Sequence, residues 1–291
     1  MYFQFPYDDN RQKQANELLE TFRTRFWLKE HHWFVQCQWN PSYNQAFLYT
    51  LPYAFERFHF YSEYCFISTC PNEKDYWIDN PVRLLEHNHP KTSTNQGLIP
   101  YHLRFPNSRH FKISFPFNEN FLSITSSFIH LISIDITIQD KNSIHCQLPL
   151  LLNRLPTLYA LSVNVCSSFL STLFQINNTS IRQLCFKAGC WSQIDFFSKT
   201  QFNAFEKSSL ARQCEILIIG IENRSDIFDL IKSMSNLRVL SIRCNDDEWK
   251  DMNLSSINDE LVEWLQNYLP STYSISRDRE KTLNIRLWID E

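Results

Sequence analysis

One arrangement of apolar residues recurs along most of the chain: an apolar position, two intervening residues, a second apolar position, one residue and a third. It is clearest in LPTLYALSV, where Leu158, Leu161 and Val163 fit it, and in SNLRVLSI near residue 240. Side chains of a β-strand alternate between its two faces, so the second and third positions share one face. The pattern therefore predicts a strand at each occurrence.

Eight such triplets can be aligned, and His87 and Ser108 are the members that are not apolar. They recur at intervals of about 21–27 residues, with one longer interval of about 35 residues before Ile221, and this range is typical of leucine-rich repeats. The triplets are Phe55, Phe58, Phe60; Val82, Leu85, His87; Ser108, Phe111, Ile113; Leu131, Ile134, Ile136; Leu158, Leu161, Val163; Ile181, Leu184, Phe186; Ile216, Ile219, Ile221; and Leu237, Leu240, Ile242.

The residues that alternate with the triplets are mostly polar, as in Ser133, Asp135 and Thr137. A doubly wound sheet buries both faces and lacks this alternation. The sequence therefore predicts an α/β fold: an irregular leucine-rich-repeat-like solenoid with a parallel strand layer, helices on its convex side and terminal caps.

Segments between the triplets have helical periodicity. The best is a helix capped by Ser225, with Ile227, Leu230, Ile231 and Met234 on one face. The interval between Phe186 and Ile221 predicts a longer helix. Shorter candidates are 121–127, 169–176 and 147–155, the last with Pro149 in its first turn.

The two ends differ from the repeats and predict caps on one continuous domain. Residues 1–50 contain a helical segment, Arg11 to Glu30, and a strand at 33–39. Residues 51–245 form the repeat region. Residues 246–291 contain a helix that begins at Asn258 or Asp259 and stops at Pro270, followed by a hairpin with strands at 273–276 and 283–289.

Composition excludes several function classes. The three glycines are far apart, which removes the glycine-rich loops that hold phosphates and dinucleotides. The net charge of -3 gives no general attraction to nucleic acid, and the apolar stretches are too interrupted to span a membrane. We expect no cofactor, no nucleic-acid partner and no membrane partner.

The nine cysteines have no disulfide-framework spacing, which predicts reduced, mostly buried thiols in a cytoplasmic or nuclear protein. The pairs His31 with His32 and His87 with His89 lack a closing ligand, as do Cys65 with Cys70 and Cys185 with Cys190. The acidic run from Asp246 to Asp251 lacks the glycine turn of a calcium loop. We therefore expect no metal site and assign no catalytic residue.

The polar face of the strands is the candidate binding surface, and its best candidates project from strand centres. They are His110, Lys112, Asp135, Asn164, Lys187, Glu222 and Arg243. Simple solvation of a sheet explains them equally well. Most aromatic residues fit the core, but Trp191, Trp249 and Tyr61 are candidates for exposed anchors.

Four segments carry a family resemblance: DELVEWLQNYLPSTYSISRDREKTLNIRLWI, LYTLPYAFERFHF, STCPNEKDYW and RLPTLYALSV. Across most of residues 11–291 the chain resembles the carboxy-terminal region of a family of uncharacterised invertebrate F-box and leucine-rich-repeat-like proteins. The resemblance implies a substrate receptor of a ubiquitin ligase. The sequence has no Leu-Pro-led F-box segment before the repeats, so we expect Skp1-type adaptor and cullin as partners only if an F-box is supplied elsewhere.

The sequence thus favours a non-catalytic protein–protein interaction module whose partner is a protein of unknown identity. It leaves an alternative from another class open, a hydrolase or transferase on an unrecognised α/β fold. An active site would bring a cysteine or serine, a histidine and a carboxylate together in one pocket.

Overall fold

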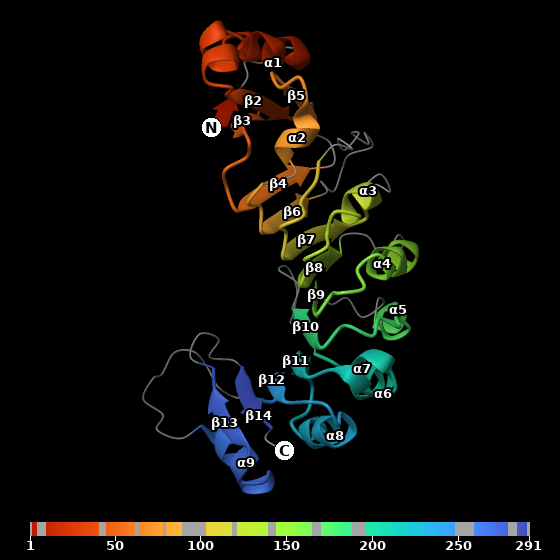
Figure 1. The fold of residues 1–291 in the computed structure, drawn as a ribbon. Coiled ribbons are helices and arrows are strands. Elements are labelled where there is room, and N and C mark those ends of the chain that lie inside the picture. The colour runs from red at the N-terminus through yellow and green to blue at the C-terminus, as the bar shows by residue number, and fades with distance from the viewer. Residues whose placement is uncertain are drawn as a thin grey trace. The chain divides into compact units, whose positions relative to one another are not determined.

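The computed structural model describes two compact units, Met1–Ser143 and Ile144–Glu291, each with helices and a mostly parallel sheet (Figure 1). The division falls inside the region predicted to be one continuous domain. The described residues are 2–4, 10–40, 45–61, 64–77, 80–88, 103–117, 121–138, 144–164, 170–187, 196–247, 259–278 and 284–289.

The first unit opens with an antiparallel sheet packed against a helix. Its strand order is β1 (Tyr2–Gln4), β3 (Gln45–Leu51), β2 (Phe34–Trp39) and β5 (Cys65–Ser68). Helix α1 (Arg11–Glu20) ends ten residues earlier than the helical segment predicted, and a short π-helical segment, η1 (Phe26–Glu30), follows it. The core between α1 and the sheet consists of Ala15, Leu19, Val35, Cys37, Trp39, Ala46 and Leu48.

A second sheet in the same unit is entirely parallel. Its order is β4 (Arg57–Tyr61), β6 (Leu84–Asn88), β7 (His110–Phe115) and β8 (Ser133–Ile138). Two short helices accompany these strands, α2 (Glu73–Trp77) and α3 (Leu122–Thr125).

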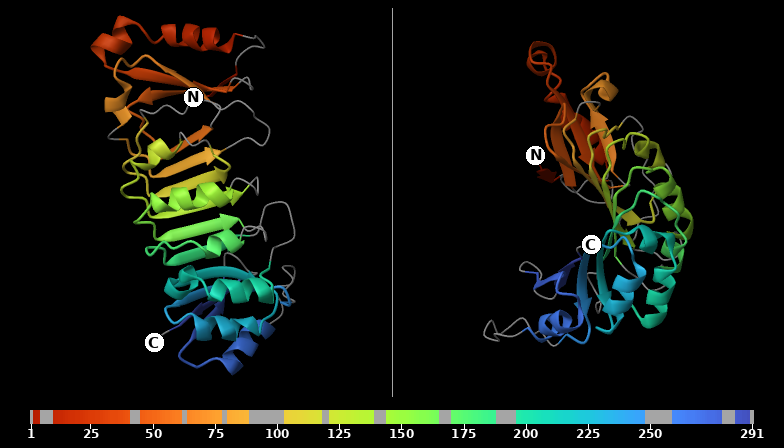
Figure 2. Two further views of the ribbon diagram at one scale, coloured as in Figure 1. Left: turned by 90° about the vertical axis from the view of Figure 1, so that its right-hand side faces the viewer. Right: turned by 60° about the horizontal axis from the view of Figure 1, so that its bottom comes forward.

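The second unit contains four more parallel strands: β9 (Ala160–Asn164), β10 (Gln183–Lys187), β11 (Ile216–Ile221) and β12 (Val239–Cys244). Helices cover one face of these strands (Figures 1 and 2). They are α4 (Ile144–Asn153), α5 (Leu170–Phe174), α6 (Lys199–Glu206), α7 (Ser209–Gln213) and α8 (Asp226–Ser233).

The C-terminal segment folds as a helix followed by a hairpin. Helix α9 (Glu260–Tyr268) begins at its N-cap, Asp259, and its buried residues are Leu261 and Leu265. Strand β14 (Ile285–Trp288) pairs antiparallel with β12, and β13 (Ser274–Arg277) pairs antiparallel with β14. The helix and the hairpin were both predicted from the sequence.

Burial follows the predicted alternation in most parallel strands. In β9, Leu161 and Val163 are 1% exposed, whereas Ser162 and Asn164 are half-buried. Two triplet members were assigned wrongly. Phe55 is 63% exposed. In β11 the register differs from the prediction by two residues, because Leu217, not Ile219, stands beside Leu184 and Leu240. Ile216 therefore lies half-buried on the opposite face.

Backbone hydrogen bonds set a common register at the start of the strands. The carbonyl of the residue before one strand accepts two N–H groups from the start of the next. In the first unit, Arg83 O accepts from Arg109 N at 2.9 Å and from His110 N at 3.0 Å. The residues whose carbonyls are shared in this way are Glu56, Arg83 and Arg109 in the first unit and Tyr159, Arg182 and Glu215 in the second.

Side-chain amides connect segments that precede neighbouring strands. Asn80 is fully buried, donates from Nδ2 to Arg104 O at 2.7 Å and accepts from Val82 N at 3.1 Å. In the second unit, Gln213 Nε2 donates to Asn178 O at 2.6 Å. These bonds pair side-chain amides with backbone groups of the neighbouring segment.

The helices differ from their predictions in detail. Ser225 makes no capping hydrogen bond to α8, although Ile227, Leu230 and Met234 are buried as expected. Helix α4 begins at Ile144, so Pro149 lies inside it. The described residues of the long interval, from 196 onward, form two short helices, α6 and α7, each capped by a serine side chain, where one longer helix was predicted.

Arg277 joins three parts of the C-terminal segment. Its guanidinium donates to Asp247 Oδ2 at 2.9 Å and to Asp259 Oδ1 at 2.7 Å, and the three side chains are at most 19% exposed. Burial raises the pKa of the Asp259 carboxyl, but hydrogen bonds from Arg277 and from Val262 N–H outweigh it. The pKa of Asp259 therefore lies below its ordinary value of 3.8.

We expect Leu161→Asp to destabilise the second unit by roughly 3 kcal/mol or more, because an unpaired carboxylate would replace a buried side chain. Asn164→Asp is the matched control at a half-buried position beside Lys187, and it should change the free energy of unfolding by less than about 0.5 kcal/mol. Urea unfolding followed by circular dichroism measures both. Equal destabilisation would contradict the assignment of the two faces.

Because the folded-state pKa of Asp259 is lowered, its contribution to stability is fully present above pH 3.8 and is lost as pH falls below that value. We expect Arg277→Gln to lower the free energy of unfolding at neutral pH by about 2 kcal/mol and to flatten its dependence on pH in this acid range. Arg23→Gln, which breaks an exposed pair with Glu20, should cost at most about 1 kcal/mol. An unchanged acid profile in the Arg277 variant would refute this role.

Candidate functional site

The candidate site is the face of each parallel sheet opposite its helices, called here the open face. In the first unit, Phe111 stacks on Phe121 beside α3, with ring centroids 5.2 Å apart, and His87 lies 5.1 Å from the same ring. Residues that alternate with these two, such as Glu86 and Lys112, therefore project from the open face.

Four ionisable side chains form a row across this face. The strand register places His59 beside Glu86, Glu86 beside Lys112, and Lys112 beside Asp135. The Glu86 carboxylate contacts both neighbours, with His59 Nδ1 at 2.8 Å and Lys112 Nζ at 3.0 Å, and its side chain is 14% exposed. We call these four residues the charged row.

The predicted residues His110, Lys112 and Asp135 are thus brought together on two adjacent strands. His110 and Ser133 stand opposite each other at the start of β7 and β8, and His110 Nδ1 lies 2.6 Å from Ser133 Oγ. His110 and Lys112 are exposed, and Asp135 is half-buried. Sequence analysis did not select His59 and Glu86, because their importance depends on which residues stand opposite each other.

The predicted residues of the second unit lie at strand ends more than at strand centres. Asn164 and Lys187 are the last residues of β9 and β10 and stand side by side. Glu222 is exposed and follows the last residue of β11, Ile221, which forms an isolated bridge with Phe197. Arg243 lies in β12, with its guanidinium 6.0 Å from the Phe196 ring centroid.

The open face of the second unit is more apolar than that of the first. Ile216, Ile218 and Val239 are half-buried there, and Trp288 of β14 is 37% exposed. Trp288 stands opposite Val239, which stands beside Ile216. The first unit therefore presents a row of charges, and the second presents an apolar cluster formed by Ile216, Val239 and Trp288.

Some of the other residues singled out from the sequence lie outside the described part of the chain. Trp191 and Trp249 lie outside it, as do the Tyr61 side chain, His89, Cys190 and the acidic run beyond Asp247. Within the described ranges, no group of three or more histidine, cysteine or acidic side chains is arranged to hold a metal ion. His31 instead stacks on Trp33, with centroids 4.4 Å apart.

Comparison with known proteins assigns no family. No protein-family model matches the chain, and no match is found among curated proteins. No helix within the described ranges is long and apolar enough to cross a membrane. The chemistry of the open faces therefore carries the functional proposal.

The buried cysteines Cys37, Cys214 and Cys244 are poor nucleophiles. Burial raises the pKa of Cys37, Cys214 and Cys244 to about 12 each, so these thiols are uncharged at neutral pH. Of the pairs that combine a nucleophile with a base, His110 and Ser133 have suitable geometry, but the His110 side chain is exposed, and no carboxylate among the described residues contacts its ring.

We expect iodoacetamide at neutral pH to modify Cys146 in the native protein, because Cys146 is exposed. The buried thiols of Cys37, Cys214 and Cys244 should react only after denaturation. Mass spectrometry of peptides from native and denatured samples measures the difference. Rapid native alkylation of one buried cysteine would contradict this expectation and would favour an enzyme.

Proposed function

We propose that the protein is a non-catalytic protein-binding module that recognises its partner through the open face of its parallel strands. The observation that supports this most is the charged row, in which side chains of both signs occupy adjacent positions on four strands. Neighbouring strands lie about 4.8 Å apart, so the sheet fixes the spacing of these charges. A fixed charge pattern selects partners of complementary charge and steers their approach.

The proposal includes the architecture of an irregular leucine-rich-repeat-like solenoid. It is supported by the shared strand-start carbonyls and by the one-sided helices of the second unit. The register places Leu184, Leu217 and Leu240 beside one another, and the corresponding intervals of 33 and 23 residues include one insertion. In such solenoids each repeat buries its apolar face against its neighbours, which leaves the opposite face for recognition.

The F-box resemblance extends the proposal to the partner. On that basis the bound protein is the target of a ubiquitin ligase, and Skp1-type adaptor and cullin join only through an F-box supplied elsewhere. The net charge of -3 argues against nucleic acid as an alternative partner. The hydrolase or transferase alternative has weaker support, because the His110–Ser133 pair is exposed and has no orienting carboxylate among the described residues.

Exchanging two charges of the row tests the proposal. Glu86→Lys combined with Lys112→Glu keeps an opposite-charge pair but inverts the pattern presented to a partner. We expect the free energy of unfolding to fall by at most about 2 kcal/mol, because Lys112 is exposed but Glu86 is only 14% exposed, and the exchange places lysine beside His59 and glutamate beside Asp135. Partners recovered by affinity purification and mass spectrometry should bind the double variant at least about tenfold more weakly, since like charges would then meet at the interface.

Lys232→Glu, on an exposed position of α8, is the matched control and should retain all partners. Equal recovery of the partners by the wild type and the double variant would exclude the charged row as the binding site. Recovery of Skp1-type adaptor and cullin with the wild type would support the ligase role. A specific partner without them would indicate a stand-alone binding module.

A further inference from the structure

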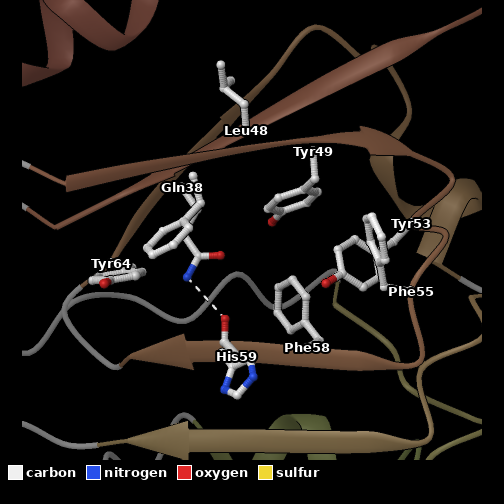
Figure 3. A pocket seen from close by; sticks show the side chains of 9 residues that line it. Gln38, Leu48, Tyr49, Tyr53, Phe55, Phe58, His59 and Tyr64 are labelled. Carbon is white, nitrogen blue, oxygen red and sulfur yellow. Dashed lines mark hydrogen bonds between the residues drawn. The ribbon is translucent and has the colours of Figure 1, made fainter. Parts of the chain in front are cut away.

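A pocket of about 370 Å³ lies between β3 of the antiparallel sheet and β4 of the parallel sheet, within the first unit (Figure 3). Its volume is within the range of small-molecule sites, roughly 300–1,000 Å³. Aromatic rings dominate its walls. The lining residues are Gln38, Phe47, Leu48, Tyr49, Tyr53, Phe55, Phe58, His59 and Tyr64.

Contacts between the rings hold the aromatic wall in place. Tyr49, Tyr53 and Phe58 meet edge to face, with centroids 5.1–5.8 Å apart. Behind them, Trp77 is fully buried and stacks on Tyr53 at 5.9 Å. Phe55 is 63% exposed and lies at the outer part of the wall. Contacts within the protein therefore fix the positions of these rings.

Two polar side chains of the lining, Gln38 and Tyr53, donate hydrogen bonds to backbone carbonyls. Gln38 Nε2 donates to His59 O at 3.3 Å, and Tyr53 Oη donates to Arg57 O at 2.7 Å. The hydroxyl of Tyr49 is shielded from solvent and has no hydrogen-bond partner among the described residues. In Figure 3 it points toward the space between Gln38 and Phe58. A buried hydroxyl without a partner costs free energy that a ligand can recover.

We propose that this pocket binds a small, uncharged aromatic molecule that carries a carbonyl group, and that the Tyr49 hydroxyl donates a hydrogen bond to that carbonyl. The rings supply apolar surface and edge-to-face contacts for an aromatic group. Burial is the main cause that raises the pKa of Tyr49 well above its ordinary value, so its hydroxyl keeps the proton that it would donate.

The surroundings favour a neutral ligand over a charged one. His59 is the one ionisable lining residue other than the tyrosines, and its imidazole points away from the rings toward Glu86 (Figure 3). An ion placed among these rings would lose its hydration without gaining an opposite charge. The pocket shares His59 with the charged row, but the proposed hydrogen bond comes from Tyr49, which is not part of that row, so the inference does not depend on the proposed function.

Two probes of matched shape separate the hydrogen bond from apolar contact. Acetophenone has an aromatic ring and a carbonyl, and ethylbenzene replaces the carbonyl with a methylene. We expect saturable binding of both to the wild type in saturation-transfer NMR titrations. Tyr49→Phe should weaken acetophenone by about 2- to 12-fold, the range of one net hydrogen bond, and should change ethylbenzene by less than about twofold.

Two further variants serve as controls. Phe55→Ala removes apolar wall without touching the hydroxyl and should weaken both probes by a similar factor. Tyr159→Phe makes the same chemical change at an exposed position of the second unit and should leave both affinities unchanged. A thermal melt followed by circular dichroism verifies that each variant is folded. The proposal fails if the wild type binds neither probe, or if Tyr49→Phe affects the two probes equally.

Discussion

The structure depends on one backbone arrangement, in which a carbonyl just before one parallel strand accepts two N–H groups from the start of the next. This shared acceptor fixes the register, and the register decides which side chains meet across the sheet. A slip of one residue would move every apolar side chain to the open face. It would also separate Glu86 from His59 and Lys112, so the charged row exists only because the strand starts are aligned.

Sequence periodicity was sufficient to assign the buried side chains where the two faces of a strand differ in polarity. Around Leu161 and Val163, polar residues alternate with apolar ones, and the predicted burial is confirmed. In ILIIGI the residues of both faces are apolar, so period two is lost and Ile216 was taken for a buried residue. The predicted burial of Phe55 was wrong for another reason: Phe55 precedes β4 and contributes to the pocket wall rather than to the helix-facing core.

The site was less predictable than the fold, because it is made by pairings between distant segments. Local polarity identified Lys112 and Asp135, but the pairing of Glu86 with His59 requires the register. Glu222 was placed at a strand centre because the triplet in ILIIGI was aligned two residues too late, with Ile219 in the position that Leu217 occupies beside Leu184 and Leu240. The pocket was missed because β3 and its pairing in the antiparallel sheet were not predicted, and β3 carries Tyr49.

The C-terminal hairpin also bears on self-association. A parallel strand at the border of a sheet exposes unpaired N–H and C=O groups, which can recruit a strand from another molecule. Here β12 pairs with β14, and the outermost described strand, β13, has only four residues with alternating exposed side chains. Its terminal arginine is anchored by two aspartates. The hairpin thus replaces a long apolar edge by a short polar one, which discourages edge-to-edge polymerisation of neighbouring molecules.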